Sequence, residues 1–394
     1  MSILIVLLSL GLLLWLGALA WTLRNAGGIV QLAAAREFPL DAHPRVSILI
    51  PARNEAAILE TSLSRFLEQD YDNYEVILVD DGSTDGTPQI AEKFLKLYPE
   101  RIRVIRVDEL PEGWNGKIHA LHRAFQEADG EWVLATDADI VVHPRALRAG
   151  LWLAGEKQAE LVTIFAFAEC VSFWEKLMLP GFSLLLASAF PFRKINDRRS
   201  SVAVASGGYI LMRRQMWAEL GGYEAIRQEM IDDLNTARIV KHSGRRIFAA
   251  VTKDLLSTRM YESFGELWEG LRKHAFAGNR YSVARLLGSM GGSFLVNALP
   301  LATLVYGSGR LIQAGAVLGP DLTLLVAMVL ALAQYLLHVV LHAPFVRYLG
   351  VGLGYAFISP LGSLVYIFIS LDSMARTLMG KGVSWKERRY GKPL

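Results

Sequence analysis

Four long apolar runs flank a polar middle in this chain of 394 residues. The runs contain no charged side chain and cover residues 1–23, 286–309, 322–346 and 348–371. Each run is long enough to cross about 30 Å of hydrocarbon as a helix. A buried core helix would explain one such run, but three in close succession favour insertion into a membrane. The pattern predicts an N-terminal membrane anchor at 1–28 and C-terminal membrane helices at 286–372, followed by a basic tail at 373–394.

The first run could instead be a cleaved signal peptide, but it lacks a basic start and its apolar stretch is too long. Arg24 and Arg36 follow it, so the positive-inside rule places the next segment in the cytoplasm. Three C-terminal spans would leave the tail outside, whereas its many basic residues favour the inside. The number of C-terminal spans therefore stays open, and we expect run 286–309, which contains Pro300, to be re-entrant or to lie flat. These signals predict a multi-pass protein of the cell (inner) membrane with a cytoplasmic middle.

The polar middle, residues 45–265, alternates between strand-like and helix-like patterns. Short runs rich in β-branched residues predict strands at 45–51, 74–80, 101–107 and 131–137. The helical spacing of apolar residues predicts helices between them, at 54–70, 89–98 and 117–128. This alternation with short loops predicts an α/β domain whose sheet is mostly parallel and carries helices on both faces.

Polar sequences follow three of the predicted strands. "PARNE" (51–55) ends the first strand, "DDGSTD" (80–85) ends the second, and "DAD" (137–139) ends the fourth. In mostly parallel sheets, ligands bind beyond the carboxyl ends of the strands. We therefore expect these three sequences to line one crevice.

Composition and motifs narrow the chemistry of this crevice. The net charge of +3 gives no indication of a nucleic-acid partner. The single cysteine, Cys170, excludes an intrachain disulfide and suits a reducing compartment. The first strand is not followed by G-x-G-x-x-G, and the chain has no Walker A motif. These absences exclude a simple dinucleotide-binding oxidoreductase and a P-loop ATPase.

The two acids of "DAD", Asp137 and Asp139, are the strongest candidates for a metal site. Two carboxylates this close in a crevice repel each other unless a cation or a shared proton intervenes. Their oxygens suit Mg²⁺ or Mn²⁺, which complete their coordination with substrate phosphates. From this stretch alone, a solvated turn after a strand is an equally good interpretation.

Seven motifs, in order along the chain, resemble those of the family-2 inverting glycosyltransferases of the GT-A fold. They are "VSILIPARNE", "YEVILVDDGSTDGT", "GWNGKIHALHRAF", "VLATDAD", "ASGGYILMRR", "LGGY" and "IDDLNTARIVKHSG". The match covers residues 45–253, and the flanking apolar runs resemble the membrane-bound branch, particularly the hopanoid-associated glycosyltransferases. The resemblance implies a GT-A (nucleotide-diphospho-sugar transferase) domain that moves a sugar from a UDP-sugar to a lipid hydroxyl with the help of a metal ion.

The resemblance assigns the donor side of the site to residues at the strand ends. The uracil and ribose would be held by Pro51, Ala52, Arg53, Glu55 and Asp81. Asp80 would assist them or, alternatively, hydrogen-bond its own loop as an Asx turn. Lys117 would face the nucleotide or its phosphates, and an ordinary exposed lysine is the alternative. Asp139 would bind the metal ion that bridges to the diphosphate, and Asp137 would contact either the metal ion or the ribose.

The resemblance places the catalytic base in "EMIDDLNTARIVKHSG". Asp233 takes the position of the family's catalytic Asp because Gly244 follows it by eleven residues. Asp232, counted with the donor-binding residues, stands where the family usually has Glu, which is a departure. An acid favoured at a helix N-terminus by the macrodipole is a compatible alternative for Asp233. Gly207 and Gly208 are expected to let the backbone approach the donor sugar or the acceptor.

Further observations concern the acceptor. The Q-x-x-R-W signature of the processive members is absent, which favours a single transfer over polysaccharide synthesis. Arg272, Lys273 and Arg280 are expected to meet either the diphosphate or anionic lipid. Segment 173–199 is apolar with a basic end, which predicts a membrane-interface segment near a lipid acceptor; an internal core helix is the alternative.

Two other functions remain open. A nucleotidyltransferase would share the sheet and the acid pair, but it would not need Asp233 and would release pyrophosphate. A non-catalytic scaffold would bind a nucleotide-sugar without turnover. The preferred prediction is a membrane-anchored glycosyltransferase of the hexosyltransferase type, with Mg²⁺ or Mn²⁺ as cofactor and a hopanoid, polyprenoid or sphingolipid-like acceptor. Its expected partners are the UDP-sugar, the lipid acceptor and the bilayer, but no nucleic acid.

Overall fold

The chain forms two compact units in the computed structural model. The described residues are 2–314, 321–380, 383–385 and 388–390. The sheet unit, as we call it, comprises Asn25–Glu169 and Phe190–Met260. The helical unit comprises Met1–Arg24, Cys170–Ala189 and Tyr261–Leu394. Residues 170–189, which the sequence analysis placed inside the 45–265 domain, therefore group with the apolar helices.

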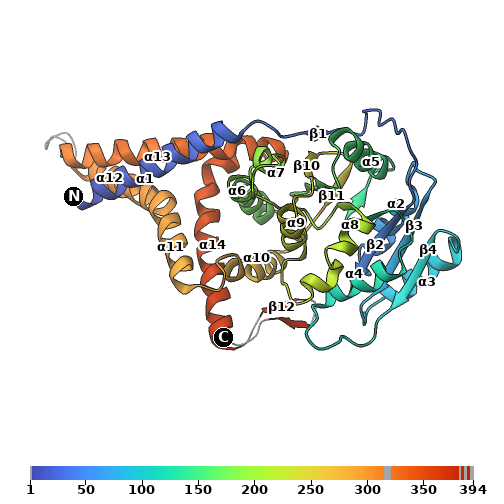
Figure 1. Ribbon diagram of the computed structural model, residues 1–394. Helices are drawn as coiled ribbons and strands as arrows, with labels where there is room; N and C mark the ends of the chain where they lie inside the picture. Colours follow the sequence, from blue (N-terminus) through green and yellow to red (C-terminus); the bar gives the residue numbers. More distant parts are fainter. Residues whose placement is uncertain (1, 315–320, 381–382, 386–387, 391–394) are drawn as a thin grey trace. The chain divides into compact units, whose positions relative to one another are not determined.

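An eight-stranded sheet forms the centre of the sheet unit (Figure 1). Its strands, from edge to edge, are β1 Gln31–Leu32, β10 Ile247–Thr252, β7 Leu161–Phe165, β9 Ile210–Arg213, β5 Trp132–Ala135, β2 Val46–Ala52, β3 Tyr74–Asp80 and β4 Ile102–Arg106. Only β9 runs antiparallel to its neighbours within this sheet. The prediction of a mostly parallel sheet is therefore confirmed. All residues of β2 and β3 are buried, as expected of parallel strands covered on both faces.

Helices cover both faces of this sheet. They are α2 Leu59–Leu67, α3 Thr87–Leu97, α4 Gly116–Glu127, α5 Ala146–Lys157, α7 Phe192–Ile195, α8 Arg214–Glu219, η1 Gly222–Ile226 and α9 Asp232–His242. Two neighbouring residues of β2 pack on opposite faces of the sheet. Ile48 packs in a core cluster with Leu59 of α2, and Leu49 packs in a second cluster with Ile118 of α4. A small second sheet is formed by β6 Val141–Val142, β11 Leu256–Thr258 and β8 Phe167–Ala168.

The helix predicted from residue 54 begins only at Leu59. Asn54 has a positive φ of 51°, a left-handed conformation that cannot continue a helix. Its amide and that of Ala56 donate to the side chains of Ser83 and Asp85, at 3.0 Å in each case. Residues 54–56 therefore belong to a loop–loop contact, and the helix starts after it.

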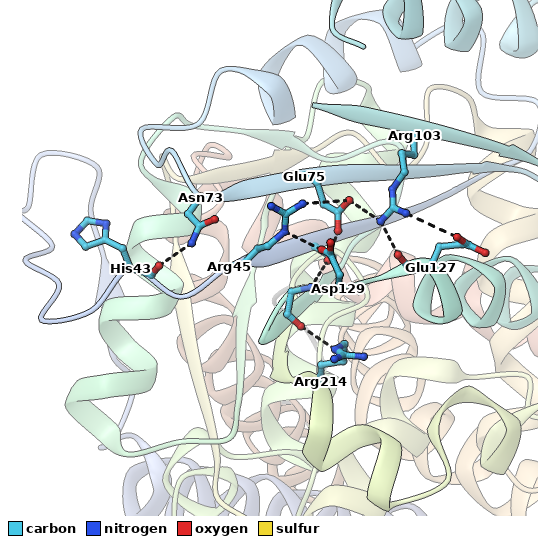
Figure 2. Close-up of polar contacts among 10 residues, drawn as sticks. His43, Arg45, Asn73, Glu75, Arg103, Glu127, Asp129 and Arg214 are labelled. Atoms are coloured by element: carbon cyan, nitrogen blue, oxygen red, sulfur yellow. Dashed lines mark hydrogen bonds and ion pairs between the residues drawn. The ribbon is translucent and has the colours of Figure 1, made fainter. Parts of the chain in front are cut away.

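A polar network joins the amino ends of β2, β3 and β4, opposite the edge where the strands end (Figure 2). Glu75 is only 6% exposed. Its carboxylate accepts from Ser47 Oγ at 2.7 Å and from Arg103 Nη2 at 2.6 Å, and Arg45 Nη2 lies 4.0 Å away. Arg45 also donates to Asp129 at 2.8 Å. A buried carboxylate needs such partners because desolvation otherwise disfavours its charge.

Removal of the Glu75 carboxylate is expected to destabilise the sheet unit. Glu75→Ala removes the acceptor of Ser47 Oγ and one of the two acceptors of Arg103 Nη2, and should lower the free energy of unfolding by about 1–3 kcal/mol. Denaturant unfolding of the full chain in detergent would measure the loss. Glu131→Ala is the control, because its pair with Arg213 at 2.7 Å is exposed on both sides and should contribute less than about 0.5 kcal/mol. Equal losses in the two variants would contradict this prediction.

Among the described residues, the helical unit contains four helices that are long and apolar enough, by length and composition, to cross a membrane. These candidate spans are Ser2–Asn25, Val283–Gln313, Leu322–Tyr348 and Gly354–Leu378. Its elements are α1 Ser2–Asn25, α6 Phe173–Ala189, α10 Phe264–Gly278, α11 Val283–Ser293, η2 Phe294–Ala298, α12 Leu299–Ala314, α13 Leu322–Tyr348, α14 Gly354–Leu378 and the strands β12 Val383–Trp385 and β13 Arg388–Tyr390. The last predicted run, 348–371, is shifted: Gly350 adopts a positive φ of 68°, so the final helix begins at Gly354.

The run predicted to be re-entrant or flat is helical from Val283 to Ala314, with a π-helical turn at Phe294–Ala298. Pro300 follows this turn and has no amide hydrogen to donate to the carbonyl of Val296. That carbonyl accepts a hydrogen bond from Trp15 Nε1 of α1 at 3.1 Å. The irregular turn is therefore stabilised from a neighbouring helix, and its depth in a membrane stays a prediction.

Helix α6 contains most of the segment predicted to lie at the membrane interface. Leu177 and Met178 are buried within the helical unit, whereas Leu185 and Leu186 are exposed. Its contacts include α10, α13 and α14 of the same unit, and Trp21 Nε1 of α1 donates to the carbonyl of Ser188 at 3.0 Å. The interfacial role stays a prediction, and the basic end of the segment, residues 190–199, belongs to the sheet unit.

Some basic residues of the helical unit belong to the described residues, and others do not. Arg272 is 4% exposed and pairs with Asp372 of α14 at 3.1 Å, within the helical unit. β12 and β13 form a two-stranded antiparallel sheet in the predicted tail. The tail residues Lys381, Lys386 and Lys392 lie outside the described residues.

Candidate active site

The loops that follow β2 and β3 are joined by hydrogen bonds. Arg53 follows β2 directly, and its Nη1 donates to the carbonyl oxygens of Asp81 and Gly82, at 2.5 and 3.2 Å. The amide of Glu55 donates to Thr87 Oγ1 at 2.8 Å. The predicted donor-binding residues of "PARNE" and "DDGSTD" therefore lie together at the carboxyl edge of the sheet.

Pro51 and Ala52 are the last two residues of β2, and the carbonyl of Ala52 accepts from the amide of Asp81 at 2.9 Å. Asp80 Oδ1 accepts from the amide of Ser83 at 3.0 Å, so the Asx-turn alternative for Asp80 is present in the structure. Asp80 Oδ2 is buried and has no hydrogen-bond partner among the described residues. This carboxylate therefore supports its loop with one oxygen and retains acceptor capacity on the other.

Lys117 lies between two carboxylates from distant parts of the chain. Its backbone amide donates to the N-cap Asn115 at 3.1 Å, which fixes the start of α4. Its Nζ lies 2.7 Å from Asp137 Oδ1 and 3.0 Å from Asp232 Oδ2. Burial acts to lower the pKa of this lysine, but the two carboxylates outweigh that effect and raise the pKa well above its ordinary range. Lys117 therefore stays protonated at the centre of an acidic site.

Gly207 lies where three charged side chains meet. Its amide donates to Asp233 Oδ2 at 3.1 Å. A Cβ atom at this position would lie 3.0 Å from Asp137 Oδ2 and 3.3 Å from Lys117 Nζ, tighter than ordinary contacts. The absence of a side chain therefore lets the carboxylates approach the backbone here.

Gly208 is restricted for a different reason. A Cβ atom on it would come within 2.7 Å of Ile140 Cδ1, and its carbonyl accepts from the buried Thr136 Oγ1 at 2.8 Å. Both glycines lie directly before β9. The start of β9 pairs with the end of β5, so the glycines lie beside the carboxyl end of β5.

Asp233 is the second residue of α9, and its carboxylate accepts from the amides of Gly207 and Leu234, at 3.1 and 2.6 Å. Burial, followed by the neighbouring charge of Asp232, raises the pKa of Asp233 from an ordinary 3.8 to about 7. Lys117 and the Leu234 amide act in the opposite direction but do not offset the increase. A carboxyl group with this pKa can accept a proton near neutral pH, as a general base must.

The residues of "DAD" fit a divalent cation. Asp137 and Asp139 are partly exposed, and Asp139 Oδ2 is 3.4 Å from Thr258 Oγ1, a long hydrogen bond. Within the described parts of the chain, no group of three or more His, Cys, Asp or Glu side chains is placed to hold a metal ion. Carboxylate oxygens suit Mg²⁺ or Mn²⁺, whose coordination is completed by water and phosphate oxygens.

Several residues that support the site were not identified from the sequence. Thr163 Oγ1 of β7 accepts from the amide of Ser206 at 2.9 Å, next to Gly207. The carbonyl of Arg227 accepts from the amide of Asn115 at 2.7 Å, which links the "GWNGK" loop to the segment before α9. A polar residue within a buried strand, such as Thr163, is a usable signal, whereas a backbone contact such as that of Arg227 leaves none in the sequence.

Comparisons with known proteins agree on the family of this domain. Residues 47–221 match the Glycosyl transferase family 2 model. Beta-monoglucosyldiacylglycerol synthase of Synechocystis sp. is 28% identical over 262 residues, which are 62% of this chain and 53% of that protein. Putative glycosyltransferase EpsE of Bacillus subtilis is 29% identical over 190 residues, which are 48% of this chain and 63% of that protein. The chain thus spans a little over half the length of these curated relatives.

A solved structure shares the fold. The mannosyltransferase PcManGT of Pyrobaculum calidifontis, in complex with GDP-Man and Mn²⁺, aligns with a TM-score of 0.54 at 20% identity. The alignment covers 93% of this chain and 99% of that chain. The GT-A fold predicted from the sequence is therefore confirmed. The motif order, the fold and the family match lead to one conclusion: residues 47–221 form a domain of glycosyl transferase family 2.

Proposed function

We propose that the protein is an inverting, metal-dependent glycosyltransferase that moves one sugar from a UDP-sugar to the hydroxyl group of a membrane lipid. The position of Asp233 carries this proposal. A carboxyl group with a pKa of about 7 lies against Gly207. Gly207 in turn adjoins Asp137 at the carboxyl edge of the sheet. Such an arrangement provides a proton acceptor and a leaving-group side within one site.

In the proposed reaction, Asp233 takes the proton of the acceptor hydroxyl while that oxygen attacks the anomeric carbon of the donor sugar. The bond between the anomeric carbon and the diphosphate breaks, and UDP leaves on the opposite side of the sugar. This displacement inverts the configuration, and its geometry is that of inverting glycoside hydrolysis with a lipid hydroxyl in place of water. Asp233 would bind and orient the hydroxyl before it accepts the proton.

The leaving group would be held at the strand ends. Asp139 and Asp137 would hold Mg²⁺ or Mn²⁺, and a dication there stabilises the negative charge that develops on the diphosphate. The residues of "PARNE" together with Asp81 would hold the uracil and ribose. Gly207 and Gly208 would leave room for the donor sugar beside the backbone. Mn²⁺ in the related mannosyltransferase structure supports a divalent cation, although the donor of that protein is GDP-Man.

The proposed acceptor is a lipid of the hopanoid, polyprenoid or sphingolipid type. Four candidate membrane spans among the described residues support a position at a lipid surface, and one curated relative is named for glucosylated diacylglycerol synthesis. We place the sheet unit in the cytoplasm of a cell (inner) membrane protein, where nucleotide-sugars are made, following the positive charges after the first span.

Incubation of the purified full-length protein with a panel of UDP- and GDP-sugars, Mn²⁺ and total membrane lipid tests the proposal. Mass spectrometry should find a new glycolipid with one added sugar, together with free UDP. Release of pyrophosphate would instead indicate a nucleotidyltransferase, and nucleotide-sugar binding without any product would indicate a scaffold. A product made only from GDP-sugars would overturn the choice of UDP.

The proposed base predicts how activity depends on pH. Asp233 must be deprotonated to accept a proton, so kcat/KM should rise with pH and level off above about 7, the pKa of this carboxyl group. Well below that pH it should fall about tenfold per pH unit. Asp232→Asn removes a negative charge that raises this pKa, so its profile should shift to lower pH. A flat profile, or an unshifted one in Asp232→Asn, would contradict the assignment.

A further inference from the structure

The Lys117 ammonium group forms an ion pair with Asp137, one of the two carboxylates proposed to bind the metal ion. Its Nζ lies 2.7 Å from Asp137 Oδ1, a full ion-pair contact. Both side chains are about one third exposed, at 34% and 33%. The contact is therefore partly screened by water, which weakens it relative to a fully buried pair.

An alternative partner for Lys117 lies close by. Asp232 Oδ2 is 3.0 Å from the same Nζ, and its side chain is only 16% exposed. The Asn115 cap fixes the lysine backbone at the start of α4, so departure of the ammonium from Asp137 would have to come from side-chain rotation. Departure from Asp137 would leave the ammonium paired with Asp232, and the incoming diphosphate offers it further negative charge.

We propose that Lys117 is a resident counter-cation that neutralises Asp137 until the donor arrives, so that the metal ion and the nucleotide bind cooperatively. A dication and an ammonium on one carboxylate repel each other, so the metal ion alone binds weakly. The negative charge of the diphosphate would draw the ammonium away from Asp137, and that carboxylate would then be available to the metal ion. The coupling is reciprocal, because each ligand then raises the affinity for the other. This inference rests on the proposed function and adds to it a coupling between metal binding and nucleotide binding.

Titration of the full-length protein with MnCl₂, read by the electron paramagnetic resonance signal of free Mn²⁺, tests the inference without any activity assay. In the absence of nucleotide, Lys117→Met should bind Mn²⁺ about tenfold or more tightly than the wild type, because the competing cation is gone. Asp232→Asn should not tighten binding, because Lys117 then has Asp137 as its remaining partner. Addition of UDP should raise the Mn²⁺ affinity of the wild type more than that of Lys117→Met.

The double variant Lys117→Met/Asp232→Asn is the matched control. It removes one positive and one negative charge, so the net charge of the site is unchanged. Competition at Asp137 predicts that it still binds Mn²⁺ more tightly than the wild type, whereas a general charge effect predicts wild-type affinity. The double variant also serves if Lys117→Met, which removes the positive charge beside Asp137 and Asp232, fails to fold.

The outcomes separate this inference from the proposed function. Wild-type Mn²⁺ affinity in both Lys117 variants would overturn the resident-cation proposal. Unchanged Mn²⁺ binding in Asp139→Ala would instead overturn the metal site of the proposed function, whatever the Lys117 variants do. Tight binding in the Lys117 variants that is lost on addition of Asp139→Ala supports both.

Discussion

Asp233→Asn is expected to lower sugar transfer by about 10²–10⁴-fold while the protein still binds UDP with Mn²⁺. The asparagine keeps the size of the side chain and an oxygen that can accept from the Gly207 amide, now at 3.1 Å. It cannot accept a proton, so only the step that deprotonates the acceptor hydroxyl is lost. Initial rates with a UDP-sugar and lipid acceptor, together with calorimetric titration of UDP and Mn²⁺, measure the two effects separately.

A matched control for this variant is Asp72→Asn, which changes an exposed acid in the turn before β3. Its transfer rate should equal that of the wild type. If Asp233→Asn retained full activity, Asp233 would not be the base. If it lost UDP binding as well as activity, its role would be structural and the rate loss would not identify a proton acceptor.

Asp139→Ala should abolish the Mn²⁺-dependent part of UDP binding and lower transfer by about 10²–10³-fold. The reason is that a diphosphate leaving group then departs without the dication that stabilises its charge. UDP titration with and without Mn²⁺ should show a difference in affinity for the wild type and none for the variant. An undiminished metal effect in Asp139→Ala would contradict its role as a ligand.

The same titration distinguishes the two interpretations of Asp137. If Asp137 binds the metal ion, Asp137→Ala should resemble Asp139→Ala. If Asp137 contacts the ribose, UDP affinity should fall equally with and without Mn²⁺. Asp108→Ala, which removes an exposed partner of Arg106, is the control for loss of negative charge.

The sheet and its site edge could be predicted from the sequence because both depend on local patterns. Apolar β-branched runs indicated β2, β3 and β5, and polar residues directly after them had to lie at one edge of a parallel sheet. The start of α2 was predicted five residues too early, because the backbone amides of residues 54–56 bond to side chains of the next loop. Apolar periodicity does not record such a contact.

The contacts within the site could not be predicted from sequence patterns. Lys117 pairs with Asp137, 20 positions away, and with Asp232, 115 positions away, and no local spacing encodes either pair. The sequence left Asp80 between two roles, and the buried amide of Ser83 decided where one of its oxygens points. Segment 173–189 lies inside the polar middle in sequence, yet it packs with helices that are distant along the chain. These features follow from tertiary packing. The resemblance to a known family could therefore suggest the roles of these residues but not the residues that they contact.

The reversed direction of β9 has a consequence for how this fold can diversify. A sheet whose strands all run one way exposes only the segments after its strands at the ligand edge. Because β9 is antiparallel to β5 and β7, the segment that leads into it, residues 190–208, reaches the same edge from the opposite direction. Changes in the length and composition of that segment can therefore alter the ligand edge, while the register of β2, β3 and β5 and the loops that follow them stay intact.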